Sequence, residues 1–388
     1  MKLAVVASID KTTTPSSKGG MEVWTSNFVL ESSKRGHHID LYATEGSIHG
    51  ERVRLIPSLD RPLNDYFSDE YFTENPGDFD KRKEKFMSTV YASLLKKVRD
   101  QEDGYDIIVD SVAYPSFSFN TNTFHKPVLT IGHFPVEFML KFYVKTLGWP
   151  ENNTVVFPSR FQNDHATFLP ESKRHVIPHG IDEASLTFSP EGGSGMLWMA
   201  RVHHKFMNKG LDDALTVANT LKRPIYATGF IERSSRAYFD EIIRPLLSEY
   251  ATFDEQGMAT PIDKSHVFGN AKLFLFPLKW EEAFGLVMLE SLACGTPVVA
   301  YARGAVPEII EDGTTGFIVN SSADDIRGAF TIQKTGQEGL CEAVERIYAM
   351  SKADYAEMRR ACRARIEKSF TRRRMFDGYE QLFTTITT

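Results

Sequence analysis

The sequence has 388 residues, more than a single hydrophobic core usually serves, so two domains are expected. Hydrophobic residues make up 42% and charged residues 25%, which excludes a disordered chain or a fibre. The formal net charge of -6 excludes a global basic surface for nucleic acid. Cys294, Cys341 and Cys362 form no CxxC pair and no zinc-ligand spacing, which favours a reducing compartment.

The N-terminal residues lack both the apolar core and the cleavage site of a signal peptide. No stretch reaches the roughly 20 apolar residues that a membrane span needs. We therefore expect a cytoplasmic protein.

The first half of the chain alternates short apolar runs with helical segments. Residues 3–9 predict a buried strand, and a loop rich in Thr and Ser then ends at Gly19-Gly20. A helix up to Gly36 and a strand at residues 39–42 complete a βαβ unit. Further strands are expected at 106–110, 128–133, 155–158 and 175–178, with a basic amphipathic helix at 81–99.

A glycine-dense run, Gly192-Gly193-Ser194-Gly195, interrupts this alternation and indicates a flexible linker or hinge. The same rhythm then restarts, which favours an α/β fold with a second Rossmann-like domain. Strands are expected at 196–200, 225–228, 273–277, 298–301 and 317–319, and helices at 211–221, 236–247 and 286–293. Ligands of such sheets bind beyond the carboxyl ends of the strands, where helix N-termini attract phosphate.

Residues 280–297, WEEAFGLVMLESLACGTP, carry the most informative pattern. Glu282 and Glu290 lie on either side of a Phe284-Gly285 turn that opens a helix. Gly285 permits close approach of the backbone to a ligand, and carboxylates so placed can accept hydrogen bonds from sugar hydroxyls. The alternative is that both acids lie on an ordinary solvated helix face.

The segment from Glu282 to Glu290, continued by SLACGTP, resembles the E-x7-E signature of retaining glycosyltransferases of family 4, also called glycosyl transferases group 1. The resemblance extends over nearly the whole chain. Its other matching segments, in chain order, are Gly19-Gly20, 35–39, 177–182, 199–201, Lys209-Gly210, 304–308 and 313–317. One departure is Ala200, which stands where the family usually has glycine before the arginine.

This resemblance implies the GT-B fold, in which two Rossmann-like domains face each other across a cleft. It implies an acceptor-binding domain at residues 1–188 and a nucleotide-sugar-binding domain at 189–370. Residues 371–388 would form a helix that packs back on the N-terminal domain.

The resemblance also implies roles for individual residues. Glu290 would bind the donor ribose, and Glu282 the hydroxyls of the transferred sugar. Arg201 and Lys209 would hold the diphosphate. His133 would lie near the donor sugar, although a lone histidine at a strand end is more often structural. The expected catalytic residues are His133, Arg201, Lys209 and Glu282, and the further donor-binding residues are Gly19, Gly20, Phe284, Gly285, Leu286, Val287 and Glu290.

The implied reaction is retaining transfer of a hexosyl unit from a nucleoside-diphosphate sugar to a hydroxyl acceptor. Arg201 and Lys209 would stabilise the departing phosphate, and the acceptor would attack from the face on which the leaving group departs. Because no DxD pair stands in a metal-binding setting, we expect no metal and no cofactor. A UDP-sugar is the favoured donor and GDP-mannose the next, with the base near residues 254–260; no motif identifies the acceptor.

Other functions are weighed against this one. A nicotinamide-dependent oxidoreductase needs GxGxxG directly after the first strand, but Asp-Lys-Thr-Thr-Thr follows Ile9. A non-catalytic nucleotide-sugar-binding protein, a GT-B sugar-nucleotide epimerase and a sugar phosphorylase remain open. The basic helix at 81–99 is expected to pack on the sheet; the alternative is weak peripheral contact with anionic lipid at the inner membrane face.

Overall fold

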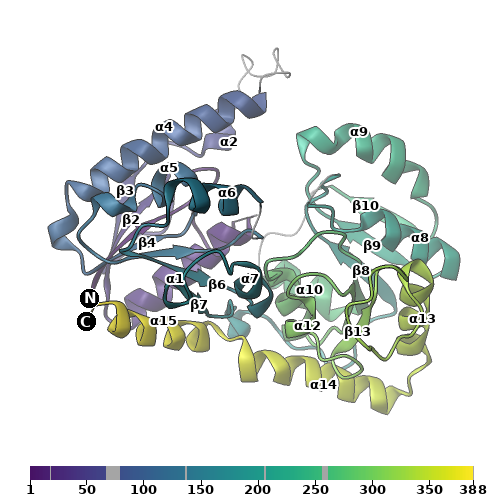
Figure 1. The fold of residues 1–388 in the computed structure, drawn as a ribbon. Helices are drawn as coiled ribbons and strands as arrows, with labels where there is room; N and C mark the ends of the chain where they lie inside the picture. The colour runs from purple at the N-terminus through teal and green to yellow at the C-terminus, as the bar shows by residue number, and fades with distance from the viewer. Residues whose placement is uncertain (18, 67–78, 136–137, 205–206, 256–260, 388) are drawn as a thin grey trace. The chain divides into compact units, whose positions relative to one another are not determined.

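The computed structural model describes residues 1–17, 19–66, 79–135, 138–204, 207–255 and 261–387 (Figure 1). The chain divides into two compact units. Unit 1 comprises Met1–Gly180 and Arg372–Thr388, and unit 2 comprises Ile181–Thr371. The boundary expected between residues 188 and 189 therefore falls inside unit 2.

Unit 1 is built on a seven-stranded parallel sheet in the order β3-β2-β1-β4-β5-β6-β7. The strands are β1 (Lys2–Val6), β2 (His38–Ala43), β3 (Val53–Pro57), β4 (Ile107–Asp110), β5 (Val128–Ile131), β6 (Asn153–Phe157) and β7 (Arg174–Val176). The strand order reverses between β1 and β4, which is the position at which open parallel α/β sheets bind ligands.

Helices cover the sheet of unit 1. They are α1 (Gly20–Lys34), α2 (Leu63–Tyr66), α4 (Phe79–Arg99), η2 (Glu102–Gly104), α5 (Pro115–Ser118), η3 (Thr121–Thr123), α6 (Phe138–Leu147), α7 (Arg160–His165), η4 (Glu171–Lys173) and α15 (Arg372–Thr387). Helix α15 packs on α1, where the ring of Phe28 lies 5.3 Å from those of Phe376 and Tyr379. Arg35 joins the same two helices through an ion pair of 2.7 Å with Asp377.

Helix α4 presents its apolar face to the interior of unit 1. Tyr91, Leu94 and Val98 are buried in the core, whereas Lys96 and Lys97 on the other face are exposed. This is the packing that we expected for the basic helix. Within the described ranges, no helix is both long enough and apolar enough to cross a membrane.

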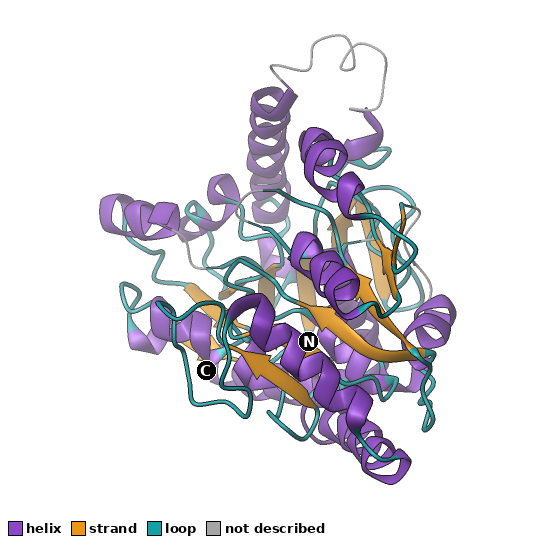
Figure 2. Ribbon diagram, turned by 90° about the vertical axis from the view of Figure 1, so that its right-hand side faces the viewer, coloured by secondary structure: helices purple, strands orange, loops and turns teal. Residues whose placement is uncertain are grey.

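Unit 2 is built on a six-stranded parallel sheet in the order β10-β9-β8-β11-β12-β13. The strands are β8 (Gly195–Met199), β9 (Ile225–Thr228), β10 (Ala251–Asp254), β11 (Ala271–Phe276), β12 (Val298–Tyr301) and β13 (Gly316–Val319). Here the order reverses between β8 and β11. Figure 2 shows the strands of both sheets among helices, as expected for parallel sheets with both faces covered.

The helices of unit 2 are η5 (Glu183–Ser185), α8 (Leu211–Leu221), η6 (Arg233–Ser235), α9 (Arg236–Tyr238), η7 (Phe239–Ile243), η8 (Arg244–Leu246), α10 (Pro261–Gly269), α11 (Leu286–Ala293), α12 (Val306–Ile309), α13 (Gly336–Ala349) and α14 (Lys352–Ser369). The single helix expected at 236–247 is wrong in detail, because α, π and 3-10 turns follow one another there. Pro245 explains the change, since proline has no N–H to donate and clashes with the carbonyl four residues earlier.

The glycine run at 192–195 is not a linker between the units, so that expectation is wrong. Gly195 opens β8, and the amide of Gly193 donates to the carbonyl of Ala271 at 3.5 Å. A Cβ at Gly193 would overlap the carbonyl of Asn270, so close packing of two backbones requires glycine here. The chain instead passes between the units at residues 180–181 and 371–372.

Candidate functional site

The candidate site of unit 2 lies where three neighbouring strands end. Arg201 follows β8, Glu232 follows β9 and Glu282 follows β11. Because β8 lies between β9 and β11, these loops leave the sheet at one edge, beside the point where the strand order reverses. This is the place where parallel α/β sheets bind ligands.

Lys209 and Glu282 form the centre of this site. The Nζ atom of Lys209 pairs with Oε2 of Glu282, and Nε1 of Trp280 donates to the same oxygen at 3.0 Å. The Lys209 Nζ atom also lies 4.2 Å from the centre of the Trp280 ring. Burial lowers the pKa of Lys209, while the charge of Glu282 opposes that effect. The structure therefore brings together two of the predicted residues as a buried ion pair.

Gly210 fixes where Lys209 lies. It adopts a left-handed conformation with φ of 72° directly before α8, and a Cβ there would overlap the carbonyl of Pro277, which follows β11. The carbonyl of Lys209 accepts a hydrogen bond of 3.1 Å from Nε1 of Trp198 in β8. The backbone of Lys209 is thus held against both strands that flank the switch point.

Arg201 is paired as well. Its Nη1 atom lies 3.0 Å from Oε1 of Glu232, and 42% of its side chain remains exposed. The amide of Glu232 donates to the carbonyl of Val202 at 3.2 Å, and this backbone contact holds the two loops side by side. The positive charge of Arg201 also contributes to the lowered pKa of Lys209, so the two cations lie within electrostatic range.

Glu290 lies on α11 and pairs with a residue that the motif does not contain. Oε1 of Glu290 lies 2.6 Å from Nζ of Lys264 on α10. Their side chains are only 12% and 17% exposed. Nothing in the sequence singles out Lys264 or Glu232, because helix lysines and loop glutamates are common and these pairs form only through tertiary packing.

The turn before α11 has the geometry that the motif predicted. Gly285 adopts φ of 96° and immediately precedes the helix at Leu286. The first amides of a helix have no carbonyl partner within it, so those of Leu286 and Val287 can face a phosphate. Phe284 differs from its neighbours, because its side chain is buried in the core of unit 2 and leaves only the backbone for a ligand.

Three predicted residues, Gly19, Gly20 and His133, belong to unit 1. Gly19 is the residue before α1, and its close neighbour is the Glu22 carboxylate, which a Cβ at Gly19 would overlap. His133 follows β5, with its ring 4.8 Å from Trp24 and 5.3 Å from His179.

The imidazole of His133 is neutral. Burial lowers its pKa to about 3. Its Nε2 atom is buried and has no hydrogen-bond partner among the residues that the structure describes. The ring is therefore uncharged at neutral pH.

Two further expectations concern the position of the nucleotide base and the binding of metal. The loop predicted to lie near the nucleotide base includes residues 256–260, which are outside the described residues. Asp212 and Asp213 both accept hydrogen bonds from Lys279, at 2.6 and 3.1 Å. Over the described ranges, no group of three or more His, Cys, Asp or Glu side chains is arranged to hold a metal.

Comparison with known proteins relates the fold and part of the sequence to one family. Residues 254–345 match the family model described as Glycosyl transferases group 1. The whole chain superposes on sucrose-phosphate synthase from Thermosynechococcus elongatus with a TM-score of 0.73 and 16% identity, covering 99% of each chain. An Anabaena protein in complex with UDP-glucose gives a TM-score of 0.69 at 14% identity, covering 99% of this chain and 100% of that one. The fold is GT-B, as predicted.

Individual relatives agree with this class. Alpha-maltose-1-phosphate synthase of Mycobacterium tuberculosis is 39% identical over 219 residues, which is 51% of this chain and 54% of that protein. D-inositol 3-phosphate glycosyltransferase of Mycobacterium leprae is 51% identical over 53 residues, covering 14% and 12% of the two chains. The chain thus spans about half the length, or less, of these curated relatives. The predicted resemblance to group 1 glycosyltransferases is confirmed.

Proposed function

We propose that this protein is a retaining glycosyltransferase that moves a hexosyl unit from a nucleoside-diphosphate sugar to a hydroxyl acceptor. The observation that carries the proposal is the buried Lys209–Glu282 pair beside Arg201, at the switch point of unit 2 and next to the first turn of α11. A UDP-sugar is the favoured donor, supported by the Anabaena neighbour in complex with UDP-glucose. GDP-mannose is the second candidate donor.

The donor would bind to unit 2. Arg201 and Lys209 supply the positive charge for the diphosphate, and the first amides of α11 add hydrogen-bond donors. Glu290, held by Lys264, suits the two hydroxyls of a ribose. Glu282 shares its Oε2 atom between Lys209 and Trp280, and its Oε1 atom would accept a hydrogen bond from a sugar hydroxyl.

Bond cleavage builds negative charge on the departing phosphate and positive charge at the anomeric carbon. Arg201 and Lys209 stabilise the first of these charges, because fixed cations act strongly where water is excluded. The departing phosphate oxygen takes the proton of the acceptor hydroxyl as that hydroxyl attacks the same face. Unit 1 would bind the acceptor, and the neutral ring of His133 would offer a hydrogen bond rather than a proton.

Thermal unfolding of the full chain with a panel of nucleotides tests the proposal. A ligand that binds only the folded state raises the melting temperature by mass action. The panel contains UDP-glucose, UDP-galactose, UDP-N-acetylglucosamine, GDP-mannose and NADH. We expect stabilisation by a UDP-sugar and none by NADH; stabilisation by NADH alone, or by no nucleotide, contradicts the proposal.

Product analysis with the stabilising donor separates the remaining alternatives. We expect free nucleoside diphosphate and a glycoside that keeps the donor's anomeric configuration. An epimerised sugar, a sugar phosphate, or bound donor without turnover would instead identify an epimerase, a phosphorylase or a binding protein.

A further inference from the structure

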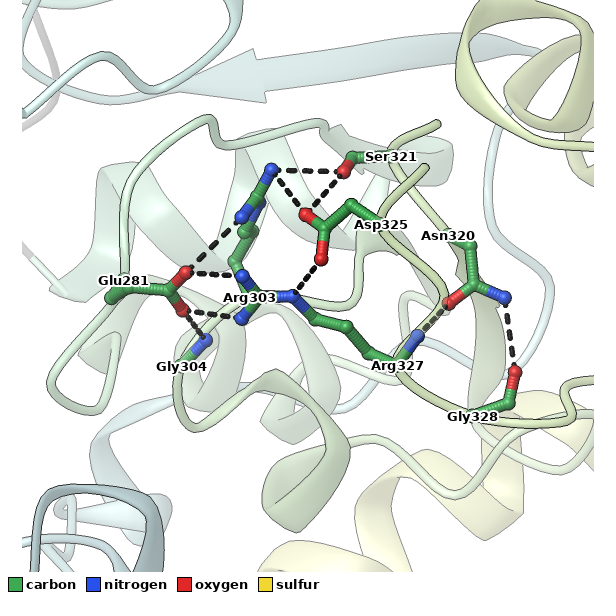
Figure 3. A network of polar contacts seen from close by, with 8 residues as sticks. All are labelled: Glu281, Arg303, Gly304, Asn320, Ser321, Asp325, Arg327 and Gly328. Carbon is green, nitrogen blue, oxygen red and sulfur yellow. Dashed lines mark hydrogen bonds and ion pairs between the residues drawn. The ribbon is translucent and has the colours of Figure 1, made fainter. Parts of the chain in front are cut away.

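A closed polar network joins the carboxyl ends of β11, β12 and β13 (Figure 3). These three strands are neighbours in the sheet, so the segments that follow them meet at one edge. The first segment carries Glu281, the second Arg303 and Gly304, and the third Asp325 and Arg327. None of these residues belongs to the E-x7-E signature.

Glu281 is the hub of this network. Its Oε1 atom accepts from Arg303 Nη1 at 3.1 Å and pairs with Arg327 Nη2 at 2.7 Å. Its Oε2 atom accepts from Arg327 Nη1 at 2.8 Å and from the amide of Gly304 at 2.7 Å. Although burial acts to raise it, the pKa of Glu281 is lowered by hydrogen bonds from Arg327 and Gly304. The Glu281 carboxylate is therefore held by contacts from the segments that follow β12 and β13.

Asp325 closes the ring on the opposite side. It lies 2.7 Å from Nη2 of Arg303 and 2.8 Å from Nε of Arg327, so each guanidinium bridges two carboxylates. Asn320 accepts from the amide of Arg327 at 2.8 Å and so fixes the backbone that presents it. Planar forked donors between paired carboxylates give a directional arrangement that lysine could not reproduce.

The network acts on the backbone of the next residue, Glu282. The carbonyl of Glu282 accepts from the amide of Ala305 at 2.9 Å, directly beside the Gly304–Glu281 hydrogen bond. Gly304 has φ of 52°, and a Cβ there would overlap the Glu282 backbone. The loop bearing Glu282 is thus fixed by two hydrogen bonds, from Gly304 and Ala305, and by the close approach of Gly304 to the Glu282 backbone.

We infer that Glu281 is a positioning residue that places the Glu282 carboxylate against Lys209 and the transferred sugar. This inference deepens the proposed function and rests on it. It also extends the donor site to residues 320–328, a segment to which the sequence motifs assign no role. Small displacements of a residue that orients substrate are costly, because the reacting groups must keep a narrow geometry.

The test compares Glu281→Gln with the wild-type full chain, using UDP and UDP-glucose as probes. Glutamine keeps the shape of the side chain but loses the ion pairs with Arg303 and Arg327. We expect kcat for UDP release to fall by about 10- to 100-fold. Affinity for UDP should stay within about twofold, because the contacts assigned to phosphate and ribose remain and an altered ion pair elsewhere is nearly neutral.

A double variant separates positioning from a general structural role. If Glu281 acts through Glu282, adding Glu281→Gln to Glu282→Gln should change kcat little, because effects through one group are not additive. Multiplicative losses would overturn the inference. Asp325→Asn, which weakens the ring one step further away, should give a smaller loss of kcat and serves as the test if Glu281→Gln does not fold.

Glu345→Gln is the matched control. Arg223 binds Glu345 with the same forked geometry, at 2.7 and 3.2 Å, on helix α13 and outside this network. The control should keep wild-type kcat. The inference is overturned, and the proposed function is not, if Glu281→Gln keeps wild-type kcat or if Glu281→Gln and Glu345→Gln lose kcat equally. A wild-type chain that binds neither UDP nor any nucleotide-sugar instead overturns the proposed function.

Discussion

At the scale of single residues, every charged group assigned to the donor has an opposite charge beside it. Lys209 pairs with Glu282, Arg201 with Glu232 and Glu290 with Lys264. An unpaired buried charge is costly, so these pairs keep the site charged and ordered. The incoming diphosphate would therefore share its cations with carboxylates already in place.

Glu290→Gln and Lys209→Ala should fail in different ways. Glu290 is assigned to the ribose, a contact present before and during reaction, so its loss should mainly weaken donor binding. Lys209 faces charge that grows as the bond breaks, so its loss should lower kcat by about 10²–10³-fold. Steady-state kinetics on both variants test this, with circular dichroism as the folding control. Wild-type kcat with only KM changed in Lys209→Ala would contradict the leaving-group role.

His133 should make the protein sensitive to acid. Burial lowers the pKa of the folded protein's His133 to about 3, below the value of about 6.5 in the unfolded chain. The unfolded state then binds the proton first, so stability is complete above about pH 6.5 and falls by about 1.4 kcal/mol per pH unit toward pH 3. Burial lowers the pKa of His179 too, so both histidines contribute in the same direction.

Urea unfolding between pH 7 and pH 4 measures this effect. His133→Gln should flatten the fall of stability by about one proton equivalent. His125→Gln is the control, because that side chain is exposed. The same slope in wild type and His133→Gln would show that His133 is not the group responsible.

At the scale of elements, the hydrophobic pattern predicted the strands and helices whose positions depend on local sequence. The strand expected at 298–301 is β12, a short apolar run, and the helix expected at 286–293 is α11, a mostly apolar segment that begins after Gly285. The linker predicted at 192–195 was wrong, because glycine is required both in flexible linkers and where two backbones pack closely. Lys264 and Glu232 could not be predicted, because their partners are distant in sequence.

Helix α14 depends on one fully buried arginine. Arg359 donates to the carbonyls of Ser189, Ala271, Gly269 and Cys294 at 2.7 to 3.2 Å. Arg359→Leu would leave these acceptors unsatisfied and should lower the free energy of unfolding by about 3 kcal/mol. Arg360→Leu, an exposed neighbour, should change it by less than about 0.5 kcal/mol. Urea midpoints compare the two variants, and equal values would contradict the anchoring role of Arg359.

At the scale of the whole molecule, the two units divide the predicted residues between them. The ion pairs assigned to the donor lie in unit 2, while Gly19, Gly20 and His133 lie in unit 1. The sequence motifs predicted the GT-B fold because they occur along the chain in the order found in the family. They placed the first domain boundary at residues 188–189, whereas the chain crosses between the units at 180–181. They placed the return to the N-terminal domain at residue 371, and the chain crosses back at 371–372.

This chain is proposed to transfer a sugar using its own cations. The most direct test is the rate of UDP release from UDP-glucose by the full chain in excess chelator. Because Arg201 and Lys209 are assigned to the leaving phosphate, we predict a rate equal to that of the untreated protein. Absence of UDP release under all conditions, or release lost in chelator and restored by magnesium or manganese, would contradict the account.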